Sequence, residues 1–145
     1  MKIRLLTSAL LLIALIAPAV RAQDSDKDTE LGKHMSKISK DYKKIRAQIA
    51  DASQNDSTIA LLTDIKTEAT AGLELKPEKE ADQPADQQAA FQANFQTALK
   101  TFIATVDNAV AALKAGDNDG AGKLVKDMFE QEKKDHKQFK KPKPE

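Results

Sequence analysis

Met35 and His136 are the residues whose chemistry stands out in this chain of 145 residues. Each lies on the apolar stripe of a predicted amphipathic helix. Met35 is about two turns into the first helix, and His136 is about one turn from the end of the last. If four helices run up and down, the start of the first and the end of the last lie at the same end. A thioether facing an imidazole across a core is a ligand pair that haem iron accepts.

Two phenyl rings are expected in the same layer as this pair. Phe91 and Phe95, four residues apart, fall at the start of the third predicted helix, and Leu73 near the end of the second lies opposite. Together they offer apolar walls for a flat macrocycle. Spacing alone leaves simpler interpretations open, because a methionine on a helical seam usually fills a core, and a histidine near a helix C-terminus often only complements the dipole.

Four predicted helices, with no plausible strand, must position these residues. A cap at Asp28 or Thr29 begins the first helix. Its apolar seam recurs every three or four residues: Leu31, Met35, Ile38, Tyr42, Ile45 and Ile49. The second helix is expected from a cap at Asp56 or Ser57 to a stop at Lys76-Pro77. Its inner stripe is Ile59, Leu62, Ile65, Ala69 and Leu73.

The second half of the chain continues the same pattern. Residues 77–86 are charged and contain two prolines, which predicts a long loop or a mobile linker. The third helix is expected over about residues 86–115, followed by a glycine-bounded turn at 116–120. The seam of the fourth helix is Val125, Phe129, Glu132, His136 and Phe139. These elements predict an all-α fold, an antiparallel up-down-up-down four-helix bundle, which we expect to be a monomer.

The N-terminal segment, residues 1–22, has the pattern of a secretory signal peptide: a basic start, an apolar run and a small-residue cleavage pattern ending at Ala22. We therefore expect a bundle domain of residues 23–145 in a bacterial periplasm, without stable membrane insertion. Cleavage removes three basic residues and no acidic one, so the net charge changes from +1 to −2, which disfavours nucleic acid as a partner. The absence of cysteine excludes covalent c-type haem attachment and Cys-based metal sites.

Short motifs surround both candidate ligands. The segment 31–38 places Met35 in the pattern Leu-x-x-x-Met-x-x-apolar. His136 is followed by an aromatic residue, Phe139, and a basic one, Lys140.

With Phe91 and Phe95 opening the third helix, and Gly116 in the turn before the last, these motifs resemble the soluble periplasmic cytochrome b562 family in order and spacing. The resemblance spans nearly all of residues 23–145. It implies one non-covalent haem b with Met35 and His136 as axial ligands, in a protein that transfers electrons to an unidentified periplasmic redox partner and is not an enzyme.

The resemblance also assigns Phe91, Phe95 and Ile38 to the haem pocket and Lys140 to a cation beside it. This chain departs from the family pattern in two places. Glu132 occupies the position, one turn before the axial histidine, where the family typically has arginine, and the third helix is about one turn longer than expected.

Two other functions remain open from the sequence. One is a cofactor-free helical bundle that acts as an interaction or chaperone-like module. The other is a copper-binding protein that uses His34, Met35 and His136, although the helical period directs His34 about a quarter-turn away from Met35, where it is expected at the surface. The sequence contains no Ser/His/Asp set and no glycine-rich phosphate loop, so neither motif points to an enzyme.

Overall fold

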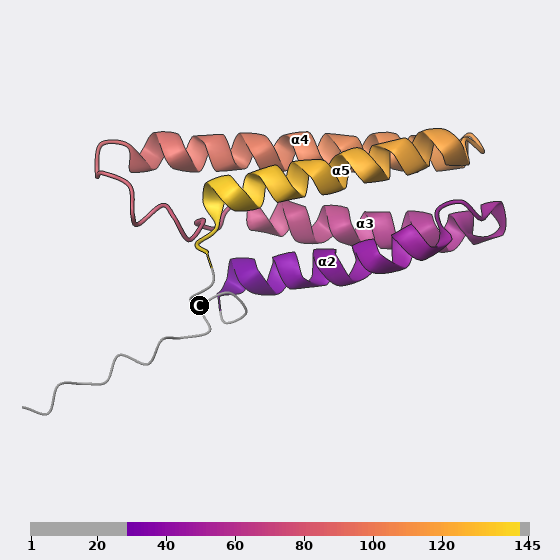
Figure 1. The fold of residues 1–145 in the computed structure, drawn as a ribbon, viewed down its shortest axis with the longest axis horizontal. Helices are drawn as coiled ribbons and strands as arrows, with labels where there is room; N and C mark the ends of the chain where they lie inside the picture. Colours follow the sequence, from indigo (N-terminus) through magenta and orange to yellow (C-terminus); the bar gives the residue numbers. More distant parts are fainter. Residues whose placement is uncertain (1–28, 143–145) are drawn as a thin grey trace, which may run out of the picture.

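A computed structural model describes residues 29–142, and within this range the chain forms four long helices and no strand. Their bounds are α2 (Glu30–Gln48), α3 (Asn55–Gly72), α4 (Gln88–Lys114) and α5 (Asn118–Phe139), with a 3-10 turn η1 (Ala52–Gln54) before α3. Figure 1 shows the helices side by side along one long axis. The predicted all-α four-helix bundle is confirmed, whereas the predicted signal peptide, residues 1–22, lies outside the described residues.

Successive helices run back and forth along this axis (Figure 1). The α2–α3 and α4–α5 turns lie at one end, which we call the turn end. The start of α2, the end of α5 and the connection of residues 73–87 lie at the other, the loop end. Each helix packs closely against the next one in the sequence. The first and last helices, α2 and α5, are also neighbours, but their backbones come close together at few positions.

The core follows the heptad-type seams of the sequence. In its main cluster each helix contributes buried apolar side chains, among them Ile45, Leu62, Val106 and Met128, all fully buried. Burial of each such side chain stabilises the fold by about 1.5–3 kcal/mol. A second, smaller cluster at the loop end consists of Phe95, Leu99 and Phe139, against which Leu31, Met35, Leu73, Phe91 and Ala98 pack. No helix between residues 29 and 142 is both long and apolar enough to cross a membrane.

Caps define the helix boundaries. The hydroxyl of Thr29 accepts a hydrogen bond from the Gly32 amide (2.9 Å), which confirms it as the cap of the first helix. Gly116 ends α4 with a φ of 78°, a conformation that glycine adopts without steric cost, and the Asp117 amide donates back to the Ala112 carbonyl (2.9 Å). The Asp117 carboxylate then caps α5 through the Gly120 amide (2.8 Å), so the turn is shorter than the predicted 116–120.

The second helix differs most from its prediction. It begins at Asn55, because Asp51 caps the preceding 3-10 turn through the Ser53 amide (2.9 Å); the predicted caps Asp56 and Ser57 lie inside α3. It ends at Gly72, four residues before the predicted stop. Backbone carbonyl groups of the residues after Gly72 accept hydrogen bonds from side chains of α4. The side-chain amides of Gln96 and Gln92 donate to the carbonyl oxygens of Leu73 (3.0 Å) and Leu75 (2.9 Å). Thr58 and Gly72 are buried in α3, beside Leu62, Ile65 and Ala69 of the predicted stripe.

Two asparagines, Asn55 of α3 and Asn118 of α5, hold the turn end together; we call this pair the amide clasp. Their side chains exchange hydrogen bonds of 2.8 and 3.2 Å. Asn118 also donates to the Ile49 carbonyl (2.8 Å), and Asn55 to the Leu113 carbonyl (3.4 Å). The clasp therefore connects the ends of α2 and α4 with the starts of α3 and α5.

Replacing Asn118 with alanine should lower the free energy of unfolding by about 1–3 kcal/mol, because the Ile49 carbonyl and the Asn55 amide lose their partner in a half-buried site. Urea denaturation measures the change. Asn108→Ala, at an exposed position of α4, is the matched control and should change the stability by no more than about 0.5 kcal/mol. Equal effects of the two substitutions would contradict the structural role of the clasp.

Candidate functional site

A stripe of small residues on α2 creates space in the bundle. Gly32, Ser36 and Ser39 are spaced four and three apart, so they share one helix face beside the apolar seam that carries Met35 and Ile38. All three line a cavity at the loop end. Their side chains are too short to fill the space between α2 and α5, so the two helices enclose a void at this level.

The cavity has a volume of about 430 Å³ and lies between α2, α4 and α5. This volume is within the range of about 300–1,000 Å³ that is typical of small-molecule sites. Its walls are largely apolar: Leu31, Ile38, Phe95, Leu99, Phe102 and Phe139. Exposed lysines at its edge, Lys40 and Lys43, show where it opens to solvent.

Both candidate ligands line this cavity. Met35 is half-buried in α2 and contacts both apolar clusters. A Cβ atom added to Gly72 would lie 3.4 Å from the methyl carbon of Met35, so this thioether packs next to the last residue of α3. His136 lies in the last turn of α5 with 43% of its side chain exposed, and its Nε2 is 3.8 Å from Oε1 of Glu132.

The other predicted pocket residues divide into two groups. Ile38, Phe95 and Lys140 line the cavity, as the resemblance implies. Phe91 does not line it. Phe91 and Phe95 each contact the ring of Phe139 edge-on, with a distance of 5.3 Å between ring centroids. Phe91 therefore packs against Phe139, which is a wall residue, without lining the cavity itself.

His34 is directed away from the cavity, toward α3. Its Nδ1 lies 2.5 Å from Oε2 of Glu68, while Lys37 donates to the other oxygen of that carboxylate at 3.0 Å. The hydrogen bond from His34, with Lys37 assisting, lowers the pKa of Glu68. The structure therefore does not bring His34 together with Met35 and His136, and no cluster of three or more His, Cys, Asp or Glu side chains suited to a metal occurs among residues 29–142.

Charges around the cavity are divided between its two sides. The α2 side carries Lys40 and Lys43, whereas the opposite side carries the carboxylates of Glu132, Asp135 and Glu78 together with one lysine, Lys140. Burial raises the pKa of Asp135, and its hydrogen bond with Gln131 only partly opposes this effect. A negatively charged group entering the cavity is therefore more favoured near α2 than near α5, where carboxylates outnumber the one lysine.

The connection of residues 73–87 fixes the end of α5. The Lys79 amide donates to the Phe139 carbonyl (3.2 Å), and its ammonium group donates to the Lys137 carbonyl (2.7 Å). The amide of Lys141 donates in turn to the carboxylate of Glu78 (3.0 Å). This segment is a docked loop and not the mobile linker that the sequence left open. It holds the helix end that carries His136.

Several cavity residues were not identified from the sequence. The wall residues Leu99 and Phe102 line the cavity, as do the charged residues Lys40, Lys43 and Asp135, but the sequence alone did not point to them. The signal that could have found the cavity is the stripe of Gly32, Ser36 and Ser39. A face of small side chains beside an apolar seam predicts that a neighbouring helix stands off or that another group fills the gap.

Comparison with known protein families gives a match over most of the described residues. The cytochrome b562 family model matches residues 30–140, which is most of the chain, and the chain therefore belongs to the cytochrome b562 family. That family consists of haem-binding, electron-transfer helical bundles. No curated protein and no solved structure matches the chain.

The contact between Glu68 and His34 predicts a pH-dependent term in stability. A carboxylate whose pKa is lower in the folded state than in the unfolded state stabilises the fold at pH values above its ordinary pKa of 4.5. This stabilisation is lost as the pH falls through the folded-state pKa. Glu68→Gln should therefore be less stable than the wild type at neutral pH, with the difference shrinking below pH 4.5. Urea denaturation at several pH values measures it.

Glu74→Gln is the control for this experiment, because Glu74 is exposed and forms no ion pair with a described residue. It should follow the wild-type pH profile. A difference between Glu68→Gln and the wild type that stays constant from neutral pH into the acid range would contradict the assigned contact.

Proposed function

We propose that this protein binds one haem b non-covalently, with Met35 and His136 as the axial ligands, and acts as a one-electron carrier. The observation that carries the proposal is that a thioether and an imidazole from the two ends of the chain line one apolar cavity. Membership of the cytochrome b562 family supports the same cofactor.

The residues around the cavity fit a porphyrin. Phenyl and aliphatic side chains from three helices form flat apolar walls, and a Met/His pair is a known axial set for haem iron. The chain has no cysteine, so a c-type thioether linkage to the macrocycle is excluded, which supports non-covalent binding. The lysines at the opening provide cations for the carboxylate edge of the ligand.

Haem, when bound, supplies a one-electron iron couple. The protein's own contribution is that Met35 of α2 and His136 of α5, which line the same cavity, would hold the iron. This arrangement leaves no ligand position for oxygen or peroxide and favours electron transfer over catalysis. The soft thioether and the apolar walls stabilise the reduced state and raise the potential relative to ligation by two histidines.

The proposal extends to the location of the protein. We propose that residues 1–22 direct export and are removed after Ala22, and that residues 23–145 function as a monomer in the bacterial periplasm. An apolar run with a basic start and a small-residue cleavage pattern supports this, as does the periplasmic character of the family. The partner is then a periplasmic redox protein that remains to be identified.

Titration of the purified protein with hemin tests the ligand assignment. The wild type should give a sharp Soret band and, after reduction, sharp α and β bands. His136→Ala should weaken hemin binding by about 10–100-fold or more, since even loss of a residue that only orients a metal ligand has an effect of this size. Met35→Leu keeps the side-chain volume but removes the sulfur, so it should bind hemin with altered reduced bands.

His34→Ala is the matched histidine control, because His34 is engaged by Glu68 outside the cavity. It should keep the wild-type spectrum. A wild-type protein that does not bind hemin would favour the interpretation as a cofactor-free interaction module. A spectrum that is unchanged in both the His136→Ala and the Met35→Leu proteins would show that other side chains bind the iron.

Filling the cavity should block hemin without unfolding the bundle. Ser36→Leu adds apolar volume on the α2 face that lines the cavity, so we expect an unchanged or higher melting temperature and hemin affinity reduced by more than about tenfold. Ala47→Leu, at an exposed position of the same helix, should leave hemin binding unchanged. Hemin uptake by Ser36→Leu at wild-type affinity would place the binding site elsewhere.

A further inference from the structure

The lysines of α2 differ in what they contact. Lys33 pairs with Glu30 at 2.5 Å, Lys37 with Glu68 at 3.0 Å and Lys44 with Asp41 at 2.9 Å. Lys40 and Lys43 form no ion pair with any residue between 29 and 142, and these two are the α2 lysines that line the cavity.

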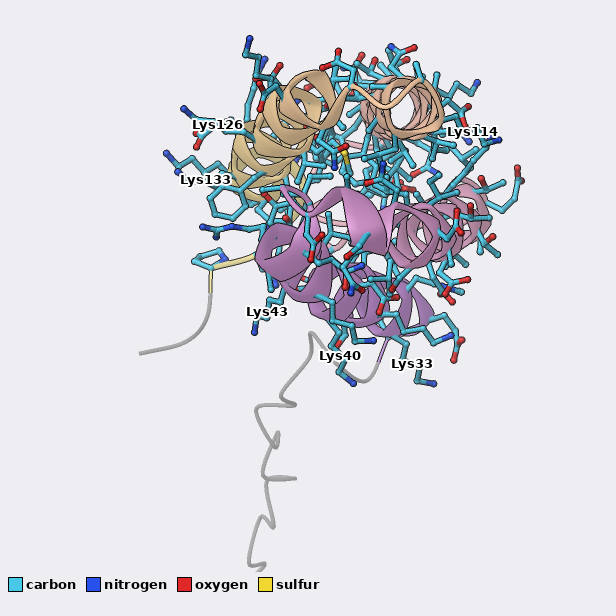
Figure 2. All side chains as sticks on the ribbon, turned by 90° about the vertical axis from the view of Figure 1, so that its right-hand side faces the viewer. Lys33, Lys40, Lys43, Lys114, Lys126 and Lys133 are labelled. Carbon is cyan, nitrogen blue, oxygen red and sulfur yellow. The ribbon has the colours of Figure 1, made fainter. Side chains whose placement is uncertain are left out.

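Figure 2 shows Lys40 and Lys43 extending from the α2 side of the bundle, with Lys114 and Lys126 in its opposite half. Both α2 lysines are exposed, so their long side chains can follow the protein surface and bring their ammonium groups to the cavity edge. The α2 edge of the cavity therefore carries two cations that no described carboxylate neutralises.

The opposite edge is mainly acidic. Glu132 and Asp135 on α5 and Glu78 in the docked loop all line the cavity there. A dicarboxylate entering with its charged end toward this edge would approach the carboxylates of Glu132 and Asp135 on α5. Lys140, the cation that the family resemblance assigns, lies on this same side, one residue before the Lys141 amide that binds Glu78.

We propose that Lys40 and Lys43 bind the two propionates of the haem, so that the carboxylate edge of the porphyrin faces α2 and not α5. This inference rests on the proposed haem binding. It assigns to the first helix of the bundle the electrostatic role that the family pattern gives to an arginine at the position of Glu132. Lysine ammonium groups act there as point charges, which tolerate small differences in propionate position.

Comparison of hemin with hemin dimethyl ester tests the assignment, because the ester keeps the macrocycle and iron but has no propionate charge. The wild type should bind hemin about tenfold more tightly than the ester, the effect expected for two partly exposed ion pairs. Lys40→Gln/Lys43→Gln should lose this preference by binding hemin about tenfold more weakly while its affinity for the ester stays within about twofold of wild type.

Lys114→Gln/Lys126→Gln is the control, since it removes the same charge from two exposed lysines that do not line the cavity. It should keep the wild-type preference for hemin, and added salt should weaken that preference only where Lys40 and Lys43 are present.

Three results would overturn the inference. Wild-type protein that binds hemin and its ester equally, or an α2 double variant that keeps the preference for hemin, would overturn this assignment alone and leave the haem site intact. Wild-type protein that binds neither compound would overturn the proposed function together with it.

Discussion

The structure depends on how α2 and α5 meet. They are joined near the middle of the bundle, where the Tyr42 hydroxyl donates to the Val125 carbonyl (3.1 Å) and the Tyr42 ring stacks on Phe129 at 5.5 Å. Nearer the loop end, the face of α2 that lines the cavity includes the small residues Gly32, Ser36 and Ser39. The helices α2 and α5 therefore contact each other at the level of Tyr42 and are separated nearer the loop end. The space between them there is part of the cavity that Met35 and His136 line.

The rest of the fold keeps this opening in place. At the turn end, the amide clasp fixes the helix ends, and the fully buried core between them resists collapse of α5 toward α2. At the loop end, the aromatic cluster around Phe139 and the docked loop hold the last turn of α5. Close packing is thus maintained on three sides of the ring, and the fourth side can accept a flat apolar group without disturbing the others.

The sequence predicted what depends on periodicity. Apolar seams with spacings of three and four fixed the four helices, and the up-and-down order brought Met35 and His136 to one cavity. It did not predict features that depend on contacts between distant segments. The early end of α3 at Gly72 depends on two glutamines of α4, and the loop is ordered by backbone groups of α5. Which lysines of α2 pair with a carboxylate among residues 29–142 also follows only from the packed structure.

The central claim is that one sulfur and one imidazole nitrogen bind the same iron from opposite sides. The proton NMR spectrum of the reduced, hemin-loaded protein tests it most directly, because the methyl group of an iron-bound methionine lies over the porphyrin ring and is shifted far upfield by the ring current. Ligation of the iron by Met35 predicts one such three-proton signal, absent from the Met35→Leu protein. A hemin-loaded protein without that signal, or one that keeps it after Met35 is replaced, would contradict the account.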